Sequence, residues 1–173
     1  MKKILLGLFV IGVLCVSNIN AQGTFSSGQL AINAGISYGF DMEEIGIRAG
    51  ATYFLNEKMR VGGDFTYWLL ESIAHIDQTA LEINGNFNYI FYDENSLMFY
   101  AIGTLGLHYV KVSYDMGEWG SGDHSDTEVA FGLGVGGEYN LGSVSIFAEP
   151  KFMLSGFDQT KFNLGVRIYL AKK

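Results

Sequence analysis

The segment His124-Ser125-Asp126 holds the residue types of a hydrolytic triad, in which a histidine takes the proton of a serine hydroxyl and an acid orients the histidine. A hydrolase is the activity that these residue types would suggest. Triads are defined by geometry, however, and adjacent residues in a loop rarely point at one another. The surrounding stretch is rich in Gly, Asp and Ser, so we interpret the segment as a solvated surface loop and predict no catalytic residues.

Metal and cofactor sites are not predicted either. His124 could bind a cation together with Asp123, Asp126 and Glu118, but no ligand spacing supports such a site. His108 has the position of a hydrogen-bonded interior residue. The 23 glycines alternate with other residues and form no phosphate-binding motif. We therefore expect a protein that is not an enzyme and has no metal and no cofactor.

A second set of chemically active residues consists of isolated charges at alternate positions among Gly, Asn, Ser and Thr. The set is Arg48, Asp64, Glu82, Glu138, Glu149, Lys151 and Arg167. Four are acidic and three are basic, so they can pair with one another where unpaired charges would be costly. We predict that they form a charge network inside a barrel. Because Arg167 is expected to pair with acids of the C-terminal half, we also predict that Arg167→Leu destabilises the protein more than Arg48→Leu.

The elements that position these charges are alternating segments, of which residues 162–170 are the clearest. Phe162, Leu164 and every second residue after them are apolar, whereas the residues between them are small or polar, and in a strand these sets lie on opposite faces. Similar segments are 29–40, 45–55, 59–70, 79–91, 96–114, 128–139 and 143–154. Their number and length predict an all-β protein, an eight-stranded antiparallel up-and-down transmembrane β-barrel.

The polar face distinguishes a membrane barrel from a soluble one. A soluble exterior would carry many Lys and Glu, whereas these polar positions are small and sparsely charged, as in a cramped lumen. We therefore expect the apolar face to contact lipid. Aromatic residues are predicted to form two girdles, one beside the tight turns (Tyr53, Tyr89, Phe91, Phe99, Tyr139) and one beside the opposite loops (Tyr38, Phe40, Tyr67, Tyr109, Phe162).

The connections alternate in length. Tight turns are expected at 56–58, 92–95 and 140–142, and longer loops at 71–78 and 115–127. This alternation is typical of outer-membrane barrels, with short periplasmic turns and longer surface loops. Pro150 falls inside an expected strand, so we predict a bulge or a strand rim at that position, because proline donates no ladder hydrogen bond.

The N-terminus predicts export. Residues 1–21 have a positive start, an apolar core and a small residue at the expected cut, as in a secretory signal peptide; 22–28 would be a linker and 29–173 the barrel. The only cysteine, Cys15, lies inside this signal, so no disulfide is expected, and a lipoprotein is disfavoured by the bulky Leu14 before it. Removal of Lys2 and Lys3 would change the net charge from −7 to −9, and an acidic chain without a basic cluster argues against nucleic acid as a partner.

Three stretches carry a family resemblance: 132–139, 147–152 and 165–170, which read GLGVGGEY, FAEPKF and GVRIYL. With the signal and the strand pattern, the chain resembles the small OmpX/OmpW-type, porin-like outer-membrane barrels, and its cleavage site resembles those of Bacteroidetes. The resemblance implies a Gram-negative outer-membrane location, periplasmic termini, a monomer, contact with lipopolysaccharide, and recognition of the last strand by the barrel-assembly machinery. That strand usually ends in an aromatic residue, whereas this one ends with Leu170 before Ala171-Lys172-Lys173.

The expected function is a non-enzymatic, envelope-structural or surface-interaction role through loops 71–78 and 115–127. No surface partner can be named from the sequence. The alternatives are a narrow porin for small molecules and, since some eight-stranded outer-membrane barrels act on lipid A, a lipid A-modifying enzyme.

Overall fold

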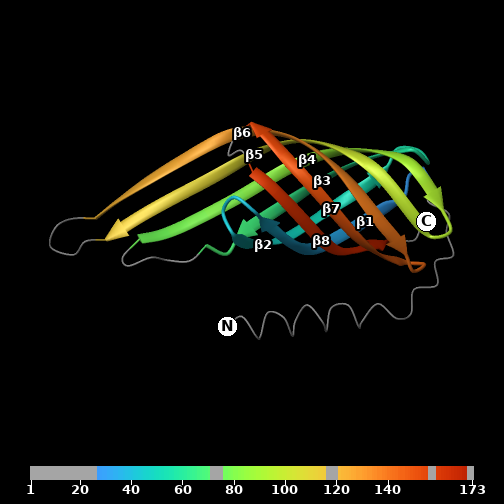
Figure 1. The fold of residues 1–173 in the computed structure, drawn as a ribbon, viewed down its shortest axis with the longest axis horizontal. Helices are drawn as coiled ribbons and strands as arrows, with labels where there is room; N and C mark the ends of the chain where they lie inside the picture. The colour runs from blue at the N-terminus through green and yellow to red at the C-terminus, as the bar shows by residue number, and fades with distance from the viewer. Residues whose placement is uncertain (1–26, 71–75, 116–120, 156–158, 171–173) are drawn as a thin grey trace.

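The computed structural model describes residues 27–70, 76–115, 121–155 and 159–170. Eight antiparallel strands follow one another in chain order, and the last pairs with the first to close a barrel (Figure 1). The strands are β1 (Leu30–Gly39), β2 (Glu44–Phe54), β3 (Met59–Trp68), β4 (Ile76–Glu94), β5 (Leu97–Asp115), β6 (Ser121–Asn140), β7 (Val144–Ser155) and β8 (Gln159–Tyr169). The predicted eight-stranded up-and-down barrel is confirmed. Within the described ranges, no helix is long and apolar enough to cross a membrane.

The predicted signal peptide at 1–21, with Cys15, lies outside the described residues. The last strand, β8, starts at Gln159, three residues before the expected start at Phe162.

The two faces of the strands are as the alternation predicts. In β8, Leu164 is 42% exposed on the outside, whereas its neighbour Asn163 is 2% exposed and lies on the inside. The exterior carries a belt of exposed Leu, Ile, Val, Phe and Tyr, and the interior holds most of the buried polar and charged side chains. This inside-out distribution is that of a barrel whose solvent on the outside is lipid.

The closing pair of strands is held by close backbone packing. β1 and β8 pair continuously from Ala31↔Tyr169 to Gly39↔Lys161. Gly35 lies opposite Gly165, and a Cβ on Gly35 would lie 2.8 Å from the Gly165 Cα. Glycine at this position therefore allows the two strands to approach each other on the crowded inner face.

Short turns join the strands at the end of the barrel that also carries both ends of the described barrel domain; we call it the turn end. Asn56 Oδ1 accepts the Lys58 N–H (2.8 Å), and Asn140 Oδ1 accepts the Gly142 N–H (2.7 Å). These side-chain bonds are those of Asx turns, which explains why asparagine opens both. The third turn differs from the prediction of 92–95, because β4 continues to Glu94 after a register shift between Ile90 and Tyr92.

The predicted loops are wrong in their bounds. Ile76–Gln78 belongs to β4, and Ser121–Thr127 belongs to β6, where residue 121 pairs with Asp115 of β5. The alternation fails there because both faces of this part of the sheet are accessible, so no apolar face is required. Residues 71–75 and 116–120 lie outside the described part of the chain.

Pro150 lies in the middle of β7, neither at its rim nor at a register shift. The pairs between β6 and β7 run through Gly134↔Lys151 and resume at Gly137↔Ala148 in the same register. Glu149 and Pro150 fall in the gap between these pairs. The missing N–H of proline is thus tolerated at an interruption of the ladder.

Candidate functional site

The seven predicted interior charges all lie in the lumen, each between 1% and 6% exposed. They come from β2, β3, β4, β6, β7 and β8, so the network connects strands that are distant around the barrel. The alternation of each strand directs its polar residues inward, and closure of the barrel then brings them together. Their contacts form three groups along the barrel axis.

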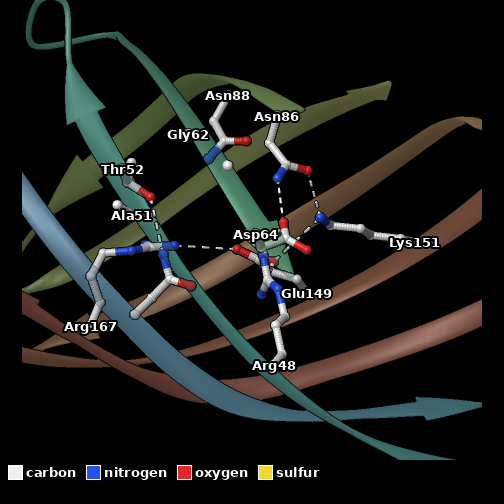
Figure 2. Close-up of a pocket in the computed structure, with 12 residues that line it drawn as sticks. Arg48, Ala51, Thr52, Gly62, Asp64, Asn86, Asn88, Glu149, Lys151 and Arg167 are labelled. Atoms are coloured by element: carbon white, nitrogen blue, oxygen red, sulfur yellow. Dashed lines mark hydrogen bonds and ion pairs between the residues drawn. The ribbon is translucent and has the colours of Figure 1, made fainter. Parts of the chain in front are cut away.

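The middle group is centred on Arg48. Its guanidinium lies 2.9 Å from Asp64 Oδ2 and 3.0 Å from Glu149 Oε2 (Figure 2). The Lys151 ammonium donates to Asn86 Oδ1 at 2.9 Å and lies 3.8 Å from Glu149 Oε2. Arg48 is the only cation within 4.0 Å of the Asp64 carboxylate among the described residues. Asp64 is otherwise bonded to neutral amides.

The second group lies toward the turn end and is centred on Glu138. Its carboxylate accepts hydrogen bonds from Arg60 (3.0 Å), Arg167, Ser145 and Tyr169. Arg167 also lies 3.4 Å from Glu149, so it joins this group to the middle one. The Arg60 guanidinium stacks 4.0 Å from the centroid of the Tyr100 ring. Each carboxylate that Arg167 contacts thus has another cation beside it.

The third group lies at the opposite end of the lumen and is centred on Glu82. Trp68 Nε1 and Gln159 Nε2 each donate to this carboxylate at 2.9 Å, and the Lys161 ammonium pairs with it. Asn84 connects this group to the middle one, because its Nδ2 lies 3.1 Å from Glu82 and 3.3 Å from Asp64.

His108 is buried beside Glu82, as expected for an interior residue, but the predicted hydrogen bonding is not observed. Its Nε2 lies 3.6 Å from Glu82 Oε2, and neither ring nitrogen has a hydrogen-bond partner in the described part of the protein.

Sequence reasoning missed two buried cations, Arg60 and Lys161. Both share the parity of recognised lumen residues, since Arg60 lies two positions before Gly62 and Lys161 two before Asn163. Arg60 lies inside the predicted segment 59–70, and Lys161 lies one residue before the segment 162–170, so the alternation could have identified both. With these residues, five bases face four acids in the described lumen, instead of the three bases expected.

The lumen is filled by these side chains. The cavity left beside Arg48, Asp64 and Lys151 measures about 10 Å³, about the space that one water molecule needs. The described residues contain no group of three or more His, Cys, Asp or Glu arranged to hold a metal ion. The arrangement can therefore stabilise a closed barrel.

Beyond the barrel, β4, β5 and β6 continue together as a three-stranded projection, which we call the projecting sheet (Figure 1). β3 pairs with β4 only as far as Trp68↔Ala80, and β7 pairs with β6 only from Ser155↔Phe131. Further out, Ile76–Thr79 and Ser121–Ala130 therefore have a described partner on one side only.

The outer face of the sheet changes from apolar to polar at the base of the projection. Leu81 and Tyr109 face each other at the boundary, and the next positions outward are Thr79, Lys111 and Ser125. Lys111 Nζ lies 2.9 Å from Asp123 Oδ2; this hydrogen bond and the paired charges raise the pKa of Lys111 and lower that of Asp123. The change in polarity is that expected where a strand leaves the lipid for water.

His124-Ser125-Asp126 lies within this sheet, in β6, and not in a loop. His124 pairs with Val112, and Ser125 pairs with Lys111. Because successive side chains of a strand point to opposite faces, His124 and Ser125 cannot face each other as a nucleophile and its base.

Comparison with known proteins supports the fold. No family model and no curated protein matches the sequence. Among solved structures, Ail, the attachment invasion locus protein of Yersinia pestis, matches with a TM-score of 0.58 and 20% identity, over 83% of this chain and 99% of Ail. Neisserial surface protein A matches with a TM-score of 0.60 and 19% identity, over 81% of this chain and 94% of the other. The chain has the fold of the small eight-stranded outer-membrane β-barrels.

A designed protein has the same architecture. A de novo transmembrane β-barrel matches with a TM-score of 0.56 and 13% identity, over 84% of this chain and 98% of the design. Because a designed barrel is nearly as similar in structure as the natural ones, this structural similarity indicates the fold only. Function must be argued from the site.

Proposed function

We propose that the protein is a non-enzymatic barrel of the bacterial outer membrane whose projecting sheet makes contacts at the cell surface. The observation that carries this proposal is the one-sided pairing of Ser121–Ala130 in β6. A strand edge with unpaired N–H and C=O groups is a surface to which an extended segment of another protein can add. The lipid-facing belt and the fold similarity support the outer-membrane location.

The orientation that the proposal requires places the turn end in the periplasm and the projecting sheet outside the cell. Ser125 is exposed on the projecting sheet, and Glu57 is exposed at the turn end. With Ser125→Cys and Glu57→Cys, a membrane-impermeant maleimide should label residue 125 on intact cells and residue 57 only after lysis. Labelling of residue 57 alone on intact cells would overturn the proposed orientation.

A narrow porin is the second candidate, because the lumen is polar throughout. The filled middle group argues against it, since a solute would have to displace the ion pairs of Arg48. We expect no regular conductance steps in planar bilayers, and steps that change with Lys151→Met would favour transport instead.

A lipid A-modifying enzyme is disfavoured by the opposite directions of His124 and Ser125. Replacement of both by alanine should leave the acylation pattern of lipid A unchanged by mass spectrometry, and a changed pattern would contradict the non-enzymatic role.

A further inference from the structure

The edge of β6 has a defined set of outward-facing backbone groups. The Phe131 N–H points toward β7, where Ser155 Oγ accepts it at 3.0 Å. Alternate residues of a strand direct their N–H and C=O groups to the same side, and the β5–β6 register is unbroken. The residues that present their backbone groups at the open edge are therefore Ser121, Asp123, Ser125, Thr127 and Val129. This edge is ten residues long, and Ser121–Thr127 lie at or beyond the change in polarity, because Thr127 pairs with Tyr109. The edge of β4 spans only Ile76–Thr79.

The side chains along this edge are acidic. Asp126 and Glu128 lie two positions apart, so they share one face, and Asp123 lies on the other face. Lys111 is the only lysine or arginine in the described projecting sheet, and it is paired with Asp123. His124 shares the face of Asp126, and His108 lies opposite Glu128 on β5. Asp126 and Glu128 thus form an acidic pair without a lysine or arginine neighbour in the described part of the projection.

This charge pattern disfavours a second copy of the chain as the occupant of the edge. If two β6 edges paired with each other, acidic residues of one copy would lie opposite or diagonal to those of the other, and like charges across a strand pair are destabilising. Charges on an edge strand are also a usual protection against self-association. The same charges favour a strand with cationic side chains at alternate positions.

We propose that the Ser121–Ala130 edge binds an extended, basic segment of another protein by strand addition, with cationic side chains on Asp126 and Glu128. This inference rests on the proposed surface role and names its partner class. Backbone hydrogen bonds would supply affinity, and the two acidic side chains would select the partner.

Asp126 also protects the edge while it is empty. Its Oδ1 accepts the Thr127 N–H at 2.8 Å, so one of the outward-facing donors is satisfied within the chain. A cation that pairs with Asp126 draws this carboxylate away and releases the Thr127 N–H for the incoming strand. Charge recognition and backbone pairing are thereby coupled at one residue.

The test uses the full-length protein in nanodiscs and ten-residue peptides followed by fluorescence anisotropy. A Thr-Lys repeat should bind, whereas a Thr-Glu repeat should not. The double variant Asp126→Asn/Glu128→Gln should weaken binding of the Thr-Lys peptide about three- to tenfold, since each cross-strand ion pair contributes modestly. The double variant Glu57→Gln/Glu94→Gln removes two exposed acids at the turn end and should leave binding unchanged.

Two N-methylated Thr-Lys peptides separate strand addition from charge attraction alone, one methylated on every threonine and the other on every lysine. An added strand directs only one of these two sets of N–H groups at β6, so one methylated peptide should lose binding and the other should keep it. Equal binding of the two methylated peptides, or equal binding by both double variants, would overturn the inference. Heat-modifiable migration on a detergent gel confirms that each variant is folded. The proposed surface role fails separately, through the labelling of residues 57 and 125 on cells.

Discussion

Arg48 and Arg167 have similar surroundings but different consequences when removed. Each contacts two carboxylates and lies near the ring of Phe147, at 5.5 and 4.8 Å from its centroid. Arg48→Leu leaves Asp64 buried without a described cation within 4.0 Å. Arg167→Leu leaves Glu138 with Arg60, and Glu149 with Arg48. The structure therefore favours the opposite order from the one expected from the sequence.

The magnitudes follow from what each substitution leaves behind. Removing one partner of a buried ion pair costs about 3–5 kcal/mol when the remaining charge has no compensation, which is the expected cost of Arg48→Leu. Loss of charged hydrogen bonds whose acceptors keep other donors costs about 1.5–3 kcal/mol, which is the expected cost of Arg167→Leu.

Urea unfolding in lipid vesicles, followed by tryptophan fluorescence and by gel migration of the folded form, measures both free energies. Arg48→Leu/Asp64→Asn is the matched control, because it removes the unpaired charge of Asp64 and should recover part of the stability lost in Arg48→Leu. Equal unfolding free energies for the two single variants, or a lower one for Arg167→Leu, would refute this account of the network. No recovery in the double variant would show that the charge of Asp64 is not the cause.

Three further outcomes are expected. Asn95 and Ser96 have φ of 52° and 69°, as a two-residue type I′ turn requires, so Ser96→Gly should raise the free energy of unfolding by about 0.5–1 kcal/mol in the same urea assay. Lys161→Met leaves the buried Glu82 without a lysine or arginine partner and should lower the free energy of unfolding by about 3 kcal/mol. Lys58→Met, in an exposed turn, should change it by less than about 0.5 kcal/mol. Lys111 lowers the pKa of Asp123, so this pair stabilises the fold above the unfolded pKa of the aspartate and the effect is lost as pH falls; by NMR, Lys111→Met should raise the titration midpoint of Asp123.

The strands were predictable where one face meets lipid and the other the lumen. In β8, Leu164 and Val166 face outward and alternate with Gly165 and Arg167, which face the lumen, so the sequence of this one strand suffices to assign both faces. The same reasoning fails at Ser121–Thr127, where water reaches both faces and alternation carries no information. It also failed near strand ends, where Arg60 and Lys161 begin the alternation and have few patterned neighbours before them.

The pairing of the charges could not be predicted from the sequence. Asp64 lies on a neighbouring strand of Arg48, but Glu149 reaches Arg48 from across the lumen. Such a contact depends on how far adjacent strands are staggered when the barrel closes, and no single strand encodes that stagger. The division of the lumen into three groups has the same origin.

The seam between β1 and β8 has a consequence for the order of folding. Every other strand pair joins neighbours in the chain, whereas the seam bond from Ser37 to Asn163 spans 126 residues. Such a contact carries the largest loop-closure entropy and forms late. Until the seam forms, Arg48 and Glu149 are not enclosed in a lumen. Desolvation of these charges and closure of the barrel must therefore occur together. The late step is therefore cooperative. A chain shortened before β8 would form an open sheet with two unpaired strand edges.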